Sequence, residues 1–230
     1  MKTTVILLIR HGDIESAETF PDATFLGQID APLSGAGFSQ AETAAAATQG
    51  VRLSAVLTSD LVRAKDTARP IAQLHGLPVQ ELKGLRERAL GVWEGEAPSR
   101  VAERQPAALG RLWSDPDFAP PGGESFAALV TRVTSALAAV VRAHAGETIA
   151  VVTHGGVHSA LVAGLLGLGP GASLMLALDR GHASLFQFFS DGGAVLSGSN
   201  LPPSGWRDAL DAMGSGPVTP FGHSCKRIPT

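Results

Sequence analysis

The amino-acid sequence predicts an α/β fold in which one central sheet carries helices on both faces. Two continuous strand-like runs, residues 5–9 and 148–153, end next to Arg10-His11-Gly12 and His154-Gly155, so each delivers a histidine followed by glycine. Other apolar runs alternate along the chain with stretches of helical spacing, and no solenoid-length repeat or heptad run interrupts them. In open α/β sheets ligands bind where such strands end, so both histidines are candidate site residues.

The individual elements follow from local patterns. Strands are predicted where short apolar or β-branched runs lie between polar turns, and helices where strong helix formers or apolar residues at helical spacing occur. The clearest helical period starts at Phe126 and continues through roughly five turns. In chain order we expect strands at 5–9, 55–58, 78–80, 148–153, 173–177, 183–189 and 194–198, and helices at 38–47, after 59–60, at 126–141 and at 157–166.

The domain organisation is predicted from the same pass along the chain. We expect one domain over residues 1–200, with a small cap inserted at about 96–120, where helical signals are weak. Residues 13–33 form a long loop over the strand ends, of a length that is often functional. Residues 201–230 contain five prolines and are predicted to be a peripheral tail with one short helix near Trp206.

Composition limits the function classes. With 44% hydrophobic and 17% charged residues, the 230-residue chain is expected to be globular with a full core. A formal net charge of −3 gives no chain-wide basic surface for nucleic acid or an anionic membrane. The single cysteine, Cys225, excludes an intramolecular disulfide. Since no signal-peptide pattern and no stretch of transmembrane length is found, we expect a cytoplasmic protein, either a monomer or a homodimer.

The polar candidates each have a structural alternative. Ser59 or Asp60 can cap the second helix, which places Arg63 in its first turn near an N-terminus that attracts anions. A single helix arginine is more often simply solvated. Glu87, between two arginines, is either a functional carboxylate or part of a surface charge cluster, and His11 is either a site residue or a surface histidine.

Five motifs in order resemble the histidine phosphatase superfamily, also called the phosphoglycerate mutase-like family. The resemblance extends from residue 5 to about 160, and it implies a three-layer α/β/α fold with a mixed, mostly parallel sheet and a small cap. The motifs are Arg10-His11-Gly12, Ser59-Asp60-Leu61-Val62-Arg63-Ala64, Leu85-Arg86-Glu87 through Trp93-Glu94-Gly95, Pro121-Gly122-Gly123-Glu124-Ser125 and Val152-Thr153-His154-Gly155-Gly156.

The resemblance also implies a chemistry that needs neither a metal nor a cofactor. His11 would be the nucleophile that forms a phosphohistidine, and Glu87 would protonate the leaving alcohol and then activate water. The phosphate would be bound by residues that include the nucleophile itself: Arg10, His11, Arg63, His154 and Gly155. His154 and His158 are four residues apart, but the intervening glycines indicate a turn, so we predict no zinc pair there.

Substrate contacts are less specific in the sequence. Candidates for the leaving-group pocket are Asp13, Phe25, Leu26, Gly27 and Trp113. The aromatic residues among them could equally pack the cap onto the body. Small sugar phosphates, phosphorylated cofactor precursors and aryl phosphates all fit a partly apolar pocket.

Hydrolysis of a small phosphomonoester is the predicted activity, with two alternatives. Cofactor-dependent mutases of the family carry Glu-Ser-x-x-Asn after Arg-His-Gly and Gly-Asn-Ser after the second histidine, whereas this chain has Asp13-Ile14-Glu15-Ser16-Ala17 and Gly155-Gly156-Val157. The cap is also not basic, which disfavours a bisphosphate. The second alternative is a non-catalytic phospho-ligand binder or scaffold, although all five residues that the chemistry needs are present.

Overall fold

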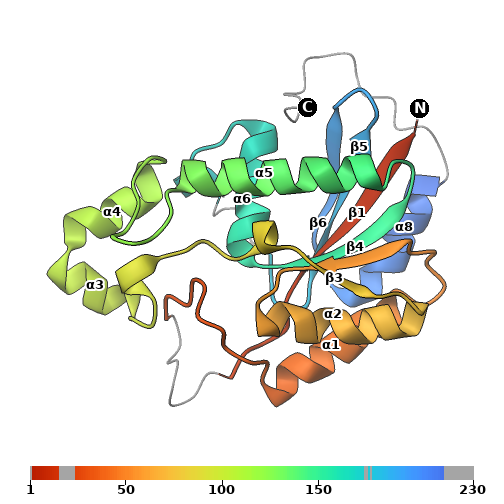
Figure 1. Cartoon of the computed structure of the whole chain (residues 1–230), viewed down its shortest axis with the longest axis horizontal. Helices are drawn as coiled ribbons and strands as arrows, with labels where there is room; N and C mark the ends of the chain where they lie inside the picture. Colours follow the sequence, from red (N-terminus) through yellow and green to blue (C-terminus); the bar gives the residue numbers. More distant parts are fainter. Residues whose placement is uncertain (1, 16–23, 174–175, 177, 215–230) are drawn as a thin grey trace.

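The structure, a computed structural model, describes residues 2–15, 24–173, 176 and 178–214 and confirms the predicted α/β class (Figure 1). One six-stranded mixed sheet has the strand order β3-β2-β4-β1-β5-β6. The first four strands in this order pair in parallel, and β5 and β6 are antiparallel. The strands are β1 (Thr3–Arg10), β2 (Ala55–Thr58), β3 (Val79–Glu81), β4 (Thr148–Thr153), β5 (Ala183–Phe189) and β6 (Ala194–Leu201).

Helices cover both faces of the sheet, which gives the expected three layers (Figure 1). Ile6 and Leu8 of β1 face a core cluster shared with α5 and α6, whereas Leu7 and Ile9 face a second cluster shared with α1, α2 and α8. This alternation is the two-residue period of a strand buried on both sides. The helices are α1 (Gly35–Ala47), α2 (Val62–His75), α3 (Pro98–Arg104), α4 (Pro106–Ser114), α5 (Phe126–Ala143), α6 (Gly155–Leu166), α7 (Pro170–Ser173) and α8 (Trp206–Gly214), with 3₁₀ turns η1 (Lys83–Leu85), η2 (Gly91–Trp93) and η3 (Pro203–Gly205).

The two strands that end in His-Gly are direct neighbours. Strands β1 and β4 run parallel, and Arg10 pairs with Thr153 in their register. The backbone N–H of His11 donates to the carbonyl of Thr153 over 2.9 Å. Because parallel strands end at the same sheet edge, this register brings His11 and His154 together.

Helix α2 begins later than predicted and is capped from outside. Its N-cap is Leu61, whose side chain cannot accept a hydrogen bond, so neither Ser59 nor Asp60 is the cap. Instead, Asp30 of the preceding loop accepts from the backbone N–H of Val62 over 2.6 Å. A carboxylate from a distant loop replaces the local cap, and Arg63 still lies in the first turn.

Helix α5 is the longest of the described helices and lies on one face of the sheet (Figure 1). By length and composition it is also apolar enough to cross a membrane, a test that a core helix of a folded domain passes as well. Leu129, Val133 and Leu137 are buried in the core cluster, and Arg132 on the same helix forms an ion pair. These contacts are those of a core helix.

The cap and the C-terminal region differ in how they join the body. Residues 98–114 form α3 and α4, whose apolar side chains belong to a separate small cluster that includes Trp93, Val101 and Leu112. We predicted 201–230 as a peripheral tail, but Trp206 of α8 is fully buried in the second core cluster, so residues up to 214 are part of the body. The remainder, 215–230, lies outside the described residues.

The strand predicted at 173–177 lies mostly outside the described residues. Its first residue, Ser173, instead ends the short helix α7 (Pro170–Ser173). A Gly-Pro-Gly sequence at 169–171 puts a proline at the helix start, where its missing N–H costs nothing.

Candidate active site

Two buried histidines form the centre of the candidate site. His11 is 4% exposed and His154 is fully buried, and their ring centroids are 5.1 Å apart with planes at 59°. Both follow directly on the ends of neighbouring strands, and His154 is also the N-cap of α6. The sequence pattern therefore placed the two rings correctly at one sheet edge.

The hydrogen bonding of His11 leaves one nitrogen free to react. Its Nδ1 lies 2.7 Å from the carbonyl of Gly12, which can only accept, so Nδ1 carries the proton and Nε2 has the lone pair. Burial, followed by the charges of Arg63 and Arg10, lowers the pKa of His11 well below its usual range. A neutral imidazole at neutral pH is the nucleophilic form.

Arg10 and Arg63 approach the histidines from the sheet edge and from α2. Arg63 is 1% exposed, and its guanidinium donates to the carbonyls of Ile29 and Gly27 over 2.7 and 2.9 Å. Arg10 donates to the carbonyl of Leu178 over 2.6 Å. Burial lowers the pKa of each guanidinium, and the nearby carboxylate of Glu87 opposes this shift. Arginine stays cationic in such surroundings.

Several buried nitrogens here lack a hydrogen-bond partner within the described part of the chain. They are Nε of Arg10, Nε of Arg63, and both ring nitrogens of His154. Leaving a buried donor or acceptor unsatisfied costs about 1–3 kcal/mol, so four such atoms in one place need an explanation. Burial, together with the charges of the neighbouring groups, lowers the pKa of His154. An anion with several acceptor oxygens would satisfy the donors among them at once.

Glu87 lies at the edge of the same cluster. One carboxylate oxygen, Oε2, accepts from the backbone N–H of Gly156 over 3.0 Å, and the other accepts from the N–H of Arg88 over 2.7 Å. The first bond ties the carboxylate to the first turn of α6, directly beside His154. Glu87 therefore lies beside the histidine pair and not in an isolated surface charge cluster, and its catalytic role stays a prediction.

Two glycines of the site lie close to neighbouring groups. A Cβ on Gly12 would lie 2.5 Å from the backbone oxygen of Gly37, so glycine is required there. A Cβ on Gly156 would lie 2.0 Å from Oε1 of Glu87, so a side chain at this position would displace the Glu87 carboxylate. The N–H of Gly12 also donates to Thr67 of α2 over 3.0 Å, which fixes the turn that presents His11.

Only some of the residues predicted for the leaving-group pocket line a cavity in the structure. Trp113 lines a cavity of about 270 Å³ that adjoins the site at Arg10, Gly155 and Gly156. Phe25 instead stacks against Trp93, with ring centroids 6.2 Å apart, and belongs to the cap cluster. The cavity is lined by Arg10, Arg88, Trp113, Phe126, Leu129, Gly155, Gly156, Ser159, Pro170, Leu178 and Asp179.

The other predicted pocket residues serve local structure. Gly27 holds Arg63 through its carbonyl, and the carbonyl of Leu26 accepts from the N–H of Ile29 over 3.0 Å. Asp13 forms an ion pair with Arg180 and accepts from the hydroxyl of Ser34. None of these three lines the cavity, and their role as substrate contacts stays a prediction.

Sequence reasoning missed the residues that support the site. Asp30 caps the helix that carries Arg63, and Thr67 binds the turn after His11. Arg132 of α5 and Glu124 form an ion pair at 2.7 Å behind Glu87. Glu124 is part of a quoted motif, but no local pattern identifies Arg132, whose other partners are backbone carbonyls of residues 84–87, more than 40 residues away.

The histidine pair at positions 154 and 158 is not arranged as metal ligands. His158 is buried on α6, and its Nε2 bonds the hydroxyl of Ser184 over 3.0 Å. Within the described ranges, no group of three or more His, Cys, Asp and Glu side chains is placed to hold a metal ion.

Comparisons with known proteins agree with this geometry. The family model described as the histidine phosphatase superfamily (branch 1) matches residues 6–200. The metal-independent phosphoserine phosphatase of Arabidopsis thaliana is 39% identical over 166 residues, which cover 70% of this chain and 68% of that protein. The native structure of a mycobacterial glucosyl-3-phosphoglycerate phosphatase superimposes with a TM-score of 0.76 at 28% identity, covering 87% of this chain and 99% of the other.

A further group of relatives is longer than this chain. The bifunctional protein of Mycobacterium tuberculosis (strain ATCC 25618 / H37Rv) is 34% identical over 191 residues. The match covers 82% of this chain but 51% of that protein, so the chain spans about half the length of the first curated relatives that it matches.

Proposed function

The chain belongs to the histidine phosphatase superfamily (branch 1), and from this premise we propose that it hydrolyses small phosphomonoesters through a phosphohistidine at His11. The observation that carries the proposal is the group of buried, unpartnered nitrogens from Arg10, Arg63 and His154 around the neutral imidazole of His11. A phosphoryl group fits this arrangement because its oxygens accept from these donors while its phosphorus faces the nucleophile.

In the first step, Nε2 of His11 attacks phosphorus and the bond from phosphorus to the ester oxygen breaks. Glu87, protonated at this stage, gives its proton to the leaving alcohol. Arg10, Arg63 and one N–H of His154 stabilise the charge on the phosphoryl oxygens during transfer. The products of this step are the free alcohol and phosphohistidine, with Glu87 as a carboxylate.

In the second step, water attacks the phosphohistidine and the N–P bond breaks. The carboxylate of Glu87 takes the proton from the attacking water, so inorganic phosphate leaves and both His11 and Glu87 return to their starting forms. The bond from Nδ1 of His11 to Gly12 keeps the ring oriented through both steps. For hydrolysis to be completed by these two steps, water must reach the phosphohistidine.

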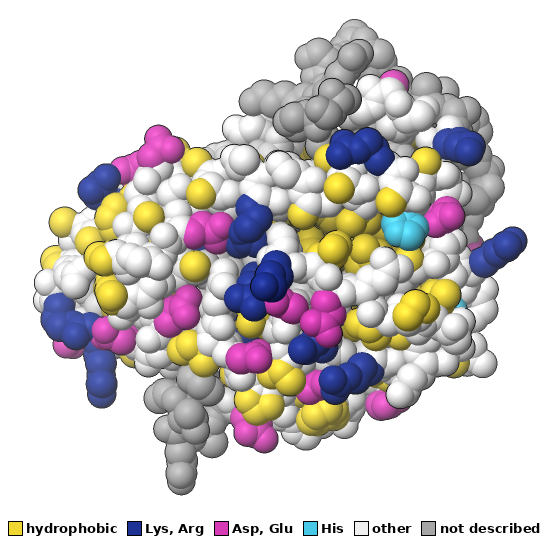
Figure 2. Space-filling view, viewed as in Figure 1, with side chains coloured by type: hydrophobic (Ala, Val, Ile, Leu, Met, Phe, Trp, Pro, Cys, Tyr) yellow, Lys and Arg dark blue, Asp and Glu magenta, His cyan; other side chains and the backbone are white. Residues whose placement is uncertain are grey.

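Hydrolysis is favoured over mutase-type transfer by the charges of the cap. Arg104 pairs with Glu96, and Arg111 pairs with Asp115 at 2.7 Å, so these two cap arginines already have carboxylate partners. On the face seen in Figure 2, basic and acidic side chains are interspersed rather than gathered by sign. A multiply charged bisphosphate would require unpaired positive charge near the site.

The substrate class that we propose is a small phosphorylated metabolite. Relatives are named for different substrates, phosphoserine in one case and glucosyl-3-phosphoglycerate in another. The cavity lined by Trp113, Phe126 and Leu129 gives an apolar wall for the leaving group, with Arg88 as a positive group. We also propose a cytoplasmic location, which rests on the single cysteine and which cell fractionation tests.

A phosphatase assay tests the proposal. Purified protein is incubated with p-nitrophenyl phosphate and a panel of sugar, amino-acid and cofactor-precursor phosphates between acidic and neutral pH, and released phosphate is measured. We expect turnover without added metal and an acid-labile phosphoprotein on quenching. Binding of phosphate without any turnover would instead support the non-catalytic binder, and phosphate transfer between positions of a sugar acid would support the mutase.

A further inference from the structure

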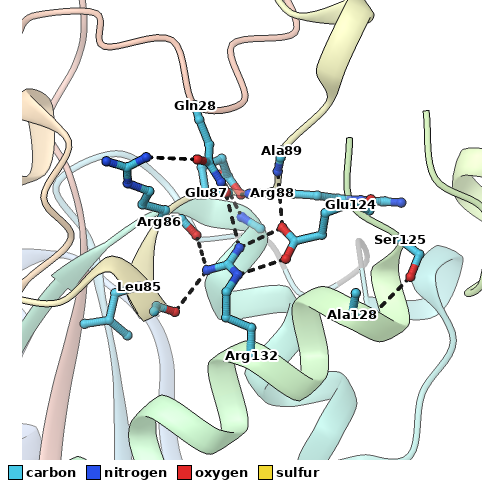
Figure 3. Close-up of polar contacts among 12 residues, drawn as sticks. Gln28, Leu85, Arg86, Glu87, Arg88, Ala89, Glu124, Ser125, Ala128 and Arg132 are labelled. Atoms are coloured by element: carbon cyan, nitrogen blue, oxygen red, sulfur yellow. Dashed lines mark hydrogen bonds and ion pairs between the residues drawn. The ribbon is translucent and has the colours of Figure 1, made fainter. Parts of the chain in front are cut away.

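We propose that the Arg132–Glu124 ion pair positions Glu87 for proton transfer, and that Arg132 and Glu124 are therefore positioning residues for the acid–base step. The inference rests on the proposed function of Glu87. Arg132 lies on α5 and Glu124 precedes that helix, and neither lines the cavity beside the phosphate site. Both residues contact the segment that carries Glu87, as Figure 3 shows.

The guanidinium of Arg132 uses all three of its nitrogens on this segment and on Glu124. Nε and Nη2 bind the two carboxylate oxygens of Glu124 over 2.8 and 2.7 Å. Nη1 donates to the carbonyls of Gly84 and Arg86 over 3.0 and 2.9 Å, and Nη2 also donates to the carbonyl of Glu87 over 3.4 Å (Figure 3). The donors of this fixed planar fork are thus matched by acceptors.

Glu124 holds the other side of Glu87. Its Oε2 accepts from the backbone N–H of Ala89 over 3.2 Å, and its backbone carbonyl accepts from Nε of Arg88 over 3.1 Å. The pair therefore binds the chain before, at and after Glu87. The side chains of Arg132 and Glu124 are 25% and 16% exposed, so this pair is screened less than a surface ion pair.

The segment needs such support because it has no regular structure of its own. Residues 86–90 lie between the 3₁₀ turns η1 and η2 and belong to neither a helix nor a strand. Their backbone groups must find partners elsewhere, and Arg132 and Glu124 supply several of them. By contrast, Arg10, His11 and His154 lie at the ends of β1 and β4, which the sheet already fixes.

Positioning matters for this residue because Glu87 must reach both the leaving oxygen and the attacking water. Its carboxylate is held at one end by the N–H of Gly156, in the first turn of α6. The ion pair fixes the backbone at the other end. A displacement of about 1 Å in a catalytic group costs up to about 100-fold in rate, and the loss falls on the step that needs the proton.

The alternative is that the ion pair stabilises the fold and nothing more. If the ion pair only stabilised the fold, its loss would lower the rate of hydrolysis of all substrates to the same extent, because less enzyme would be folded. A positioning loss is selective, because p-nitrophenolate leaves without much protonation whereas an unsubstituted phenolate needs it. The two substrates, p-nitrophenyl phosphate and phenyl phosphate, therefore separate the two roles.

The experiment compares Arg132→Lys with wild type and with a matched control. Lysine keeps the positive charge but has three donors in place of the fork. Arg69→Lys is the control, since Arg69 is an exposed helix arginine whose partner is the carboxylate of Asp66. We expect Arg132→Lys to lower kcat/KM for phenyl phosphate about 10- to 100-fold and for p-nitrophenyl phosphate less than about threefold. Arg69→Lys should leave both substrates unchanged.

A double-mutant cycle with Glu87→Gln gives the second readout. If Arg132 acts through Glu87, Arg132→Lys has little further effect on phenyl phosphate once Glu87 is replaced, so the two losses are not additive. Equal losses on both substrates, or full additivity in the cycle, would overturn the proposal. If Arg132→Lys cannot be purified folded, Glu124→Gln is measured in the same cycle with the same two outcomes. A wild-type protein that hydrolyses neither the two aryl phosphates nor any ester of the metabolite panel would refute the proposed function itself.

Discussion

The phosphate site and the cap differ in what holds them in place. The site is built from residues at the ends of two neighbouring parallel strands, with Arg63 from the first turn of α2, and all of it rests on the two large core clusters. The cap consists of two short helices over a small cluster of its own, and its charged side chains pair locally. The sheet therefore fixes the phosphate site, whereas the cap is held by its own small cluster and by local ion pairs.

This difference suits the two tasks of the proposed function, phosphoryl transfer and recognition of the alcohol portion. The chemistry of phosphoryl transfer needs donors that do not move, and a strand end within a parallel sheet provides them. In the proposed function, the cavity wall would recognise the alcohol portion. In this wall, Trp113 comes from α4 of the cap, whereas Phe126 and Leu129 come from α5 of the body. Substitutions of the phosphate-binding residues should therefore affect every substrate, and substitutions of Trp113 in the cap only some.

The largest effect is expected from His11→Ala. Loss of the nucleophile should lower turnover of every substrate by about 10⁴-fold or more and abolish acid-labile phosphate on the protein. Turnover and phosphoprotein are measured with p-nitrophenyl phosphate and one alkyl phosphate. His75→Ala is the control, because His75 lies at the far end of α2 and its ring bonds the hydroxyl of Thr48. Phosphoprotein in the His11 variant would show that the nucleophile is another residue.

Glu87→Gln should have the next largest effect. Loss of the acid–base group should slow alkyl phosphates by about 10²- to 10⁴-fold and p-nitrophenyl phosphate by much less. The measurement is kcat/KM for a series of leaving groups. Glu81→Gln serves as the control, because Glu81 is a half-exposed carboxylate on β3 that pairs with Lys65 at 3.7 Å. An equal loss across the series would contradict the acid role.

The pH dependence of the free energy of unfolding tests the body separately from the cap, because the buried His158 lies on α6 of the body. Burial lowers the pKa of His158 to about 4 from its usual 6.5. As the pH falls from 6.5 to about 4, His158 binds a proton in the unfolded chain but not yet in the folded protein. The free energy of unfolding therefore decreases over this range, and the contribution of His158 that is present above pH 6.5 is lost by about pH 4. The shift corresponds to roughly 3 kcal/mol.

Urea unfolding of wild type and His158→Gln at pH 7 and at pH 4.5 tests this expectation. The variant should lose clearly less stability between the two pH values than wild type does. His144→Gln is the control, since His144 pairs with Glu147 at 2.8 Å and is not in the core. The same acid-side loss in wild type and in His158→Gln would mean that other groups account for it.

The smallest effect is expected from Trp113→Ala in the cap. Trp113 is 39% exposed, and it lines the cavity beside Arg10. Removing this wall should raise KM for a bulky aryl phosphate such as naphthyl phosphate by about tenfold, since about 1.4 kcal/mol of apolar contact is lost. Turnover of p-nitrophenyl phosphate should change less than about twofold. Val92→Ala, at another exposed apolar residue, is the control. A large loss on both substrates would place Trp113 within the catalytic body.

Local sequence was most informative where function and regular structure coincide. The apolar runs that end in His-Gly predicted both β1 and β4 and the two histidines, because a buried strand and its polar end lie next to each other in the chain. A helix after residues 59–60 was also predicted, but its later start at Val62 and its cap were not, since the capping residue Asp30 lies 32 residues away. The peripheral tail was misjudged for a similar reason, as the burial of Trp206 depends on contacts with residues that are distant in the chain.

The sequence by itself determined the family, the α/β class and the residues that surround the proposed phosphate site, because the motifs carry these properties locally and in order. Only the tertiary structure decided that Phe25 belongs to the cap cluster while Trp113 lines the cavity, and that Arg132 reaches the carbonyls of residues 84–87 from α5. Such contacts join segments that are far apart in the chain, and the geometry that selects them exists only once the helices are packed on the sheet.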